Sequence, residues 1–141
     1  MILLDTNVVS EPMLPNPNAG VIGWLDSQFL ETVYISVITV AEIRYGLAIL
    51  PEGRRRDLLT SKFEGEVLPL FEDRVLAFDL AASQAYGNIM AVARASGRGI
   101  GTADGYIAAI ARAHGLMVAT RDTAPFIAAG LEVIDPWAPG S

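Results

Sequence analysis

The chain has 141 residues, of which 52% are hydrophobic and 18% charged, a composition typical of one folded domain rather than a disordered segment. It has no cysteine and one histidine, which excludes disulfides and thiolate metal sites and disfavours a zinc site or a Ser-His-Asp triad. The net charge of −6 argues against a general nucleic-acid-binding surface, although carboxylates that hold a divalent cation are neutralised when it binds.

The predicted elements alternate between short apolar strands and helices. Strands are expected at residues 2–4, 32–35, 116–119 and 131–134, because these stretches are short, apolar and rich in β-branched residues. Apolar residues at helical spacing, with capping residues and terminating Gly or Pro, predict helices. The predicted helices are 18–29, 37–50, 51–63, 79–96 and 105–114. Residues 67–71 and 75–78 are interpreted as extended. The alternation predicts an α/β fold with a short, mostly parallel central sheet flanked by helices.

The helix expected at 37–50 is apolar almost all round, which predicts that it is buried. Glu42 interrupts it and caps nothing. A carboxylate in such a setting has to be paired, protonated or bound to a cation.

Four carboxylates lie where an apolar segment ends or is interrupted. They are Asp5, Glu42, Asp104 and Asp122. Carboxyl ends of parallel strands share one edge of a sheet, so Asp5 and Asp122 are expected on that edge. Mutual repulsion of such groups is relieved by a divalent cation, and an all-oxygen set favours Mg²⁺ or Mn²⁺. Neighbouring polar side chains suited to orient the carboxylates are Thr6, Asn7, Thr39 and Thr120.

Three of the four carboxylates also have an ordinary structural interpretation, whereas Glu42 has none as a cap. Asp5 and Asp122 are placed to cap the turns that follow them, and Asp104 is placed to cap a helix or to stabilise its first turn. The basic residues Arg54, Arg55, Arg56 and Lys62 form either a solvated helix face or a surface that contacts phosphates.

Four segments of the sequence resemble the four motifs of PIN-domain ribonucleases, in order and with the family's spacing. They are residues 1–7, 36–46, 103–109 and 118–123. The similarity is greatest to VapC-type toxins of bacterial toxin–antitoxin pairs, especially FitB-like members, and covers the chain to about Trp137. It implies one PIN-like domain over 1–141, with a core at 1–137 and a tail at 138–141.

The resemblance implies an endoribonuclease that depends on Mg²⁺ or Mn²⁺ and hydrolyses RNA phosphodiester bonds, with transfer RNA as one candidate substrate. Asp5, Glu42, Asp104 and Asp122 would be its catalytic, metal-binding residues. The resemblance also implies a homodimer and a cognate antitoxin with a DNA-binding domain, through which the pair binds operator DNA. The chain departs from many VapC toxins at Pro125, where they carry an acid or histidine, so Asp122 is the only acid of the fourth motif.

Two other functions compete with this interpretation. The protein could act mainly as the non-catalytic partner of a DNA-binding antitoxin. A phosphoacceptor domain also places an Asp after its first strand, but the sole lysine, Lys62, lies in the wrong region for that class. No segment approaches the roughly 20 apolar residues of a membrane helix, and no signal peptide is recognisable, so a cytoplasmic protein without membrane association is expected.

Overall fold

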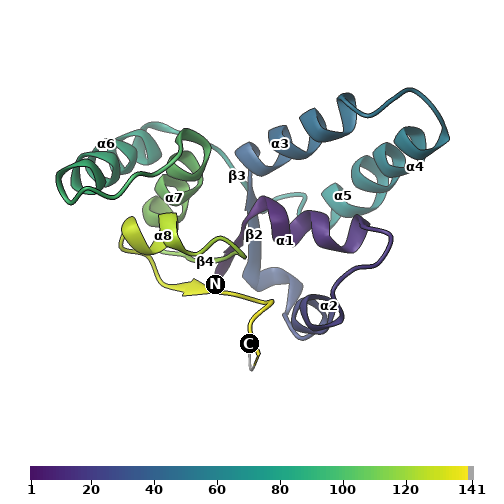
Figure 1. Cartoon of the computed structure of the whole chain (residues 1–141), viewed down its shortest axis with the longest axis horizontal. Coiled ribbons are helices and arrows are strands. Elements are labelled where there is room, and N and C mark those ends of the chain that lie inside the picture. The colour runs from purple at the N-terminus through teal and green to yellow at the C-terminus, as the bar shows by residue number, and fades with distance from the viewer. Residues whose placement is uncertain (140–141) are drawn as a thin grey trace.

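Five short parallel strands form the centre of the structure, a computed structural model that describes residues 1–139 (Figure 1). The strands are β1 (Ile2–Leu4), β2 (Val33–Ser36), β3 (Val75–Leu76), β4 (Met117–Ala119) and β5 (Val133–Ile134). Their order in the sheet is β3-β2-β1-β4-β5, with every neighbouring pair parallel. The predicted α/β fold with a short central sheet is therefore confirmed, and β1 is its middle strand.

Helices connect successive strands, as parallel pairing requires. They are α1 (Thr6–Ser10), α2 (Ala19–Asp26), α3 (Val37–Ala48), α4 (Arg54–Lys62), α5 (Leu68–Leu70), α6 (Leu80–Ala95), α7 (Thr102–His114) and α8 (Ala124–Ala128). A π-helical turn at Phe63–Val67 joins α4 to α5. Side-chain caps at Asn18, Ser36 and Asp79 begin α2, α3 and α6, as the sequence predicted.

Alternating residues of the sheet face two separate cores, as expected where successive strand side chains point to opposite faces. Ile2, Leu4 and Ile35 pack with α1, α3 and the α4–α5 segment, whereas Leu3 and Val118 pack with α6, α7 and α8. Figure 1 shows the two helical groups on either side of the strands. The carboxyl edge of the sheet therefore lies between the two groups of helices that cover its faces.

Two predictions about local structure were wrong. Residues 67–71 are helical rather than extended, because the chain continues from α4 through the π-turn into α5. Helix α3 is not buried all round: only Thr39, Val40, Ile43 and Leu47 are buried, while Tyr45 is 68% exposed. Part of the apolar surface of α3 is therefore exposed to solvent.

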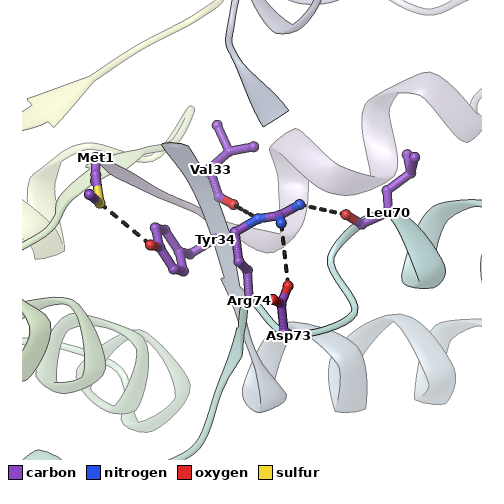
Figure 2. Close-up of polar contacts among 6 residues, drawn as sticks. All are labelled: Met1, Val33, Tyr34, Leu70, Asp73 and Arg74. Carbon is purple, nitrogen blue, oxygen red and sulfur yellow. Dashed lines mark hydrogen bonds and ion pairs between the residues drawn. The ribbon is translucent and has the colours of Figure 1, made fainter. Parts of the chain in front are cut away.

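The edge strand β3 is held against β2 by the side chain of Arg74 (Figure 2). Arg74 Nε donates to the Val33 carbonyl at 3.0 Å, and Nη2 donates to the Leu70 carbonyl at 2.5 Å. The Ile35 amide donates to the Arg74 carbonyl at 3.1 Å. These bonds secure β2, from whose carboxyl end α3 begins. Figure 2 also shows the Tyr34 hydroxyl, which donates to Met1 Sδ at 3.4 Å.

Helices α6 and α7 approach each other closely at Gly105. A Cβ there would lie 2.9 Å from Met90 Sδ and 3.0 Å from Tyr86 Cε2, closer than ordinary packing allows. Glycine thus sets the distance between the helices one residue after Asp104. Within residues 1–139, no helix has the length and apolar character needed to cross a membrane.

Candidate metal centre

The candidate site lies at the carboxyl ends of the two central strands. Leu4 pairs with Ala119 in the β1–β4 register, and the Asp5 amide donates to the Ala119 carbonyl at 2.9 Å. The residues that follow these strands, Asp5 and Thr120, are therefore adjacent across the sheet. This is the edge at which open parallel sheets place their ligands.

Asp5 is buried, with 6% of its surface exposed. One carboxylate oxygen accepts from the Thr6 amide at 2.8 Å and thereby caps α1. The other accepts from Thr120 Oγ1, also at 2.8 Å. The capping interpretation of Asp5 is correct, but the cap engages only one of its two oxygens.

The Thr120 hydroxyl joins Asp5 to the segment that carries Asp122. It is fully buried and, besides donating to Asp5, accepts from the Asp122 amide at 3.1 Å. Asn7 Nδ2 lies 3.5 Å from the same oxygen, and Asn7 Oδ1 accepts from the Arg121 amide at 3.4 Å. Thr120 and Asn7 were predicted to lie beside these carboxylates, and the structure places both residues there.

Glu42 is on an exposed turn of α3, which corrects the expectation that it is buried among apolar side chains. Thr6 Oγ1 donates to Glu42 Oε1 at 2.6 Å and lies 3.0 Å from Thr39 Oγ1. Thr39 is fully buried, and its amide donates to Ser36 Oγ at 3.1 Å, the cap of α3. Thr6 therefore connects Glu42 to Asp5, since its amide and its hydroxyl bind one carboxylate each.

Asp104 and Asp122 lie on the other side of the site. Asp104 is the third residue of α7 and is half-buried; α7 is capped by Gly101, so Asp104 stabilises the first turn rather than capping it. Asp122 follows β4 and is exposed, and the N-cap of α8 is Thr123. Both carboxylates line a cavity of about 580 Å³ between the α6–α7 loop and α8.

The charges of the four carboxylates act on one another. Burial, followed by repulsion from Asp104 and Glu42, raises the pKa of Asp5 to about 6, against the bonds from Thr120 and Thr6 that lower it. Burial, followed by repulsion from Asp122 and Glu42, raises the pKa of Asp104. Each of the four acids therefore lies within electrostatic reach of another of the set.

The donor set fits a hard divalent cation. It consists of carboxylate oxygens, and threonine hydroxyls donate to two of the carboxylates, Asp5 and Glu42. A bound cation would offset both the burial and the mutual repulsion that raise the pKa values of Asp5 and Asp104. Among residues 1–139, no three acidic or histidine side chains converge as a preformed metal cage. Instead, both carboxylate oxygens of Asp5 and one carboxylate oxygen of Glu42 accept hydrogen bonds from threonine residues.

The basic residues singled out in the sequence lie elsewhere. Arg54 and Arg55 line a separate cavity with Met13 and Pro15, and Figure 1 shows α4 at the opposite side of the molecule from α8. Arg121 stacks on Trp137, with its guanidinium carbon 5.3 Å from the ring centroid. The basic residue that does line the cavity of Asp104 and Asp122 is Arg98. The sequence analysis missed it because a lone arginine between two glycines has no periodicity or spacing that marks it.

Comparison with known proteins places the chain in a family. The model of the PIN domain family matches residues 2–130, and the chain belongs to this family. It is 58% identical over 139 residues to "VapC ribonuclease Y4jK" of Sinorhizobium fredii (strain NBRC 101917 / NGR234), covering 99% of each chain. It is 52% identical over 137 residues to "Toxin FitB" of Neisseria gonorrhoeae (strain ATCC 700825 / FA 1090), covering 97% of this chain and 99% of that one.

A solved structure shares the fold closely. A chain in "Structure of FitAB bound to IR36 DNA fragment" superposes with a TM-score of 0.96 at 50% identity, covering 100% of this chain and 99% of that chain. The resemblance to PIN-domain proteins of the VapC and FitB type is therefore confirmed.

Proposed function

We propose that the protein is the toxin of a type II toxin–antitoxin system and an endoribonuclease that requires Mg²⁺ or Mn²⁺. The observation that supports this most is that four acids from four separate segments each lie within electrostatic reach of another of the set. The relative named as a VapC ribonuclease supports the activity. We assign this role to one domain with its core at 1–137 and a tail at 138–141, of which 140–141 lie outside the described residues, and we expect it in the cytoplasm.

In this proposal the four carboxylates differ in how directly they bind the cation. Asp5, Glu42 and Asp104 would hold the cation, and Asp122 would complete the set directly or through water. When bound, Mg²⁺ or Mn²⁺ would supply a water molecule of lowered pKa and would offset charge on the reacting phosphate. Thr120 and Thr6 keep Asp5 and Glu42 in fixed orientations through their hydroxyls. The cavity beside Asp104 and Asp122 leaves room for RNA to reach them.

The test is cleavage of a transfer RNA pool by purified protein. Wild type with Mg²⁺ is expected to cleave, and cleavage is expected to stop with excess chelator and in Asp104→Asn. Glu132→Gln, which removes an exposed acid elsewhere, is the matched control and should cleave like wild type. Equal cleavage with metal, with chelator and in Asp104→Asn would reject the mechanism.

We extend the proposal to partners: a homodimer and a cognate antitoxin with a DNA-binding domain, which would link the pair to operator DNA. Support comes from the relative solved as FitAB with DNA. It also comes from a groove of about 700 Å³ beside α3, whose lining combines the apolar residues Val37, Val40, Ala41, Leu68, Pro69 and Val75 with the charged residues Arg44, Glu64 and Glu72. Apolar side chains that line an open groove with charged residues beside them are typical of a surface that binds a protein partner. Co-purification with the co-expressed antitoxin, followed by light scattering of the free chain, tests both assignments.

A second candidate function has a specific observation in its favour. The structure with TM-score 0.96 contains DNA, which fits a role as the non-catalytic partner of an operator-binding antitoxin. Operator binding by the pair that is unchanged in Asp104→Asn, together with absence of RNA cleavage by free wild type, would favour this function over the ribonuclease.

A further inference from the structure

Arg98 lines the same cavity as Asp104 and Asp122. Its side chain is exposed, and within residues 1–139 its guanidinium makes no ion pair or side-chain hydrogen bond. A guanidinium without a partner in the described residues thus lines the same cavity as two of the four acids.

The backbone that carries Arg98 is fixed by the end of α6. Gly97 adopts a left-handed conformation with φ of 72°, and its amide donates to the Arg94 carbonyl at 3.1 Å. The Arg98 amide donates to the Ala93 carbonyl at 2.8 Å, which completes a Schellman motif. Because α6 packs on α7, the start of the Arg98 side chain is fixed relative to Asp104, while its tip remains free.

Four other arginines of the chain are already engaged. Arg44 pairs with Glu64 at 2.7 Å, Arg74 binds the carbonyls of β2 and α5, and Arg112 donates to the Ala129 carbonyl. Arg121 stacks on Trp137. Arg98 therefore differs from these arginines in both respects: its guanidinium is free, and it lines the acidic cavity.

We propose that Arg98 binds the RNA phosphate that flanks the cleaved bond, and that the cavity beside it receives the intervening nucleotide. The inference rests on the proposed ribonuclease function. Guanidinium groups bind phosphate with paired hydrogen bonds, and a chain of net charge −6 needs such a contact to hold RNA near its acids. Pro125, Ile127 and Ala128 supply an apolar wall for the base and sugar.

The first experiment measures RNA binding without cleavage. In the Asp104→Asn background, Arg98→Gln is expected to weaken binding of a fluorescein-labelled transfer RNA pool about 10-fold. The slope of log affinity against log salt should fall by about 0.7–0.9, which corresponds to one lost phosphate contact. Arg94→Gln, which removes an exposed charge from the last turn of α6 and not from this cavity, is the matched control.

The second experiment measures cleavage. Because a flanking phosphate is bound alike in the ground state and the transition state, Arg98→Gln is expected to raise KM about 10-fold and leave kcat within about twofold. Arg98→Lys keeps the charge and should recover part of the loss. A structural defect would instead lower kcat, and thermal unfolding compared with Arg94→Gln identifies it.

The outcomes separate the inference from the function on which it rests. Cleavage by wild type, with binding and KM unchanged in Arg98→Gln and Arg98→Lys, overturns the role of Arg98 alone. Equal losses of RNA affinity in Arg98→Gln and Arg94→Gln overturn it as well, since they would reflect the loss of one positive charge rather than of a contact made by Arg98. A wild-type protein that neither binds nor cleaves the RNA overturns both proposals.

Discussion

The two halves of the acidic site differ in how firmly they are held. Around Asp5 the groups are largely buried and bonded: Asp5 is 6% exposed, and Thr120 and Thr39 are fully buried. The Thr6 amide and the Thr120 hydroxyl donate to Asp5, and the Thr6 hydroxyl donates to Glu42, at 2.6–2.8 Å. On the side of Asp104 and Asp122, the carboxylates are half-buried and exposed, and they line an open cavity.

The two halves are therefore suited to different tasks, one to holding groups in place and the other to admitting a ligand. The bonded half is preorganised, so that under the proposed function its carboxylates would need little rearrangement to bind a cation. The open half leaves its carboxylates accessible. We therefore expect substitutions of the buried residues Asp5 and Thr120 to alter stability or its pH dependence, and substitutions in the open half to alter activity with little loss of stability.

The largest effect is expected from Asp104→Asn. Partners that merely orient a metal ligand are worth about 10–100-fold in activity, so loss of a ligand should lower kcat at least about 100-fold. Because the change also removes one of the mutually repelling charges, the midpoint of thermal unfolding in chelator should stay level or rise. Single-turnover cleavage and calorimetry measure the two quantities, and a fall in the midpoint by several degrees would contradict the division of tasks.

A pH-dependent effect is expected from Asp5→Asn. The folded pKa of Asp5, about 6, exceeds its ordinary value of 3.8, so the folded state binds the proton more tightly. The free energy of unfolding that this group contributes is fully present below the ordinary value and declines as pH rises through about 6. By linkage, about two pKa units correspond to about 3 kcal/mol.

The measurement for Asp5 is urea unfolding of metal-free wild type and Asp5→Asn between pH 4 and 8. Relative to wild type, the variant should gain up to about 3 kcal/mol across that interval. A constant difference at all pH values would contradict the raised pKa. Excess Mg²⁺ should reduce the gain, since cation binding stabilises the charged carboxylate.

A smaller effect is expected from Thr120→Val. This nearly isosteric change removes the hydroxyl from Asp5 and from the Asp122 amide, and a lost buried hydrogen bond of this kind costs about 1–3 kcal/mol. Thr120→Ser keeps the hydroxyl and serves as the control. Urea unfolding at pH 7 measures the difference, and equal stability of the two variants would show that the bond does not hold the site together.

The smallest effect on stability is expected from Thr6→Val. The bond from its hydroxyl reaches an exposed carboxylate, so the cost should be below about 1 kcal/mol. Cleavage should nevertheless fall about 10–100-fold, because Glu42 loses the group that orients it. Thr6→Ser should retain activity, and a loss as large as that of Asp104→Asn would indicate a direct role for Thr6.

Much of the architecture follows from local patterns in the sequence. The apolar run before Asp5 and the β-branched run before Ser36 give two of the strands, and Asn18, Ser36 and Asp79 identify helix starts through their capping side chains. The four acids were predicted from their positions where apolar segments begin, end or are interrupted. Their assignment as metal ligands stays a prediction.

Other features depend on tertiary context. Glu42 was predicted to be buried because α3 is apolar in composition, but whether an apolar helix is covered depends on what packs on it. Residues 67–71 were interpreted as extended from their apolar content, which does not distinguish a short strand from a helical turn. Arg98 enters the site through the packing of α6 on α7, which no local pattern encodes.

The central position of β1 has a consequence for the order of events during synthesis. Its partner β4 lies far along the chain, and the bond from Thr120 to Asp5 spans 115 residues. At roughly 5–20 residues per second, Asp5 leaves the ribosome several seconds before Thr120 is made. The contacts at this edge therefore form only after Thr120 has been made, so a nascent chain that stops before it carries Asp5 without the bond from Thr120.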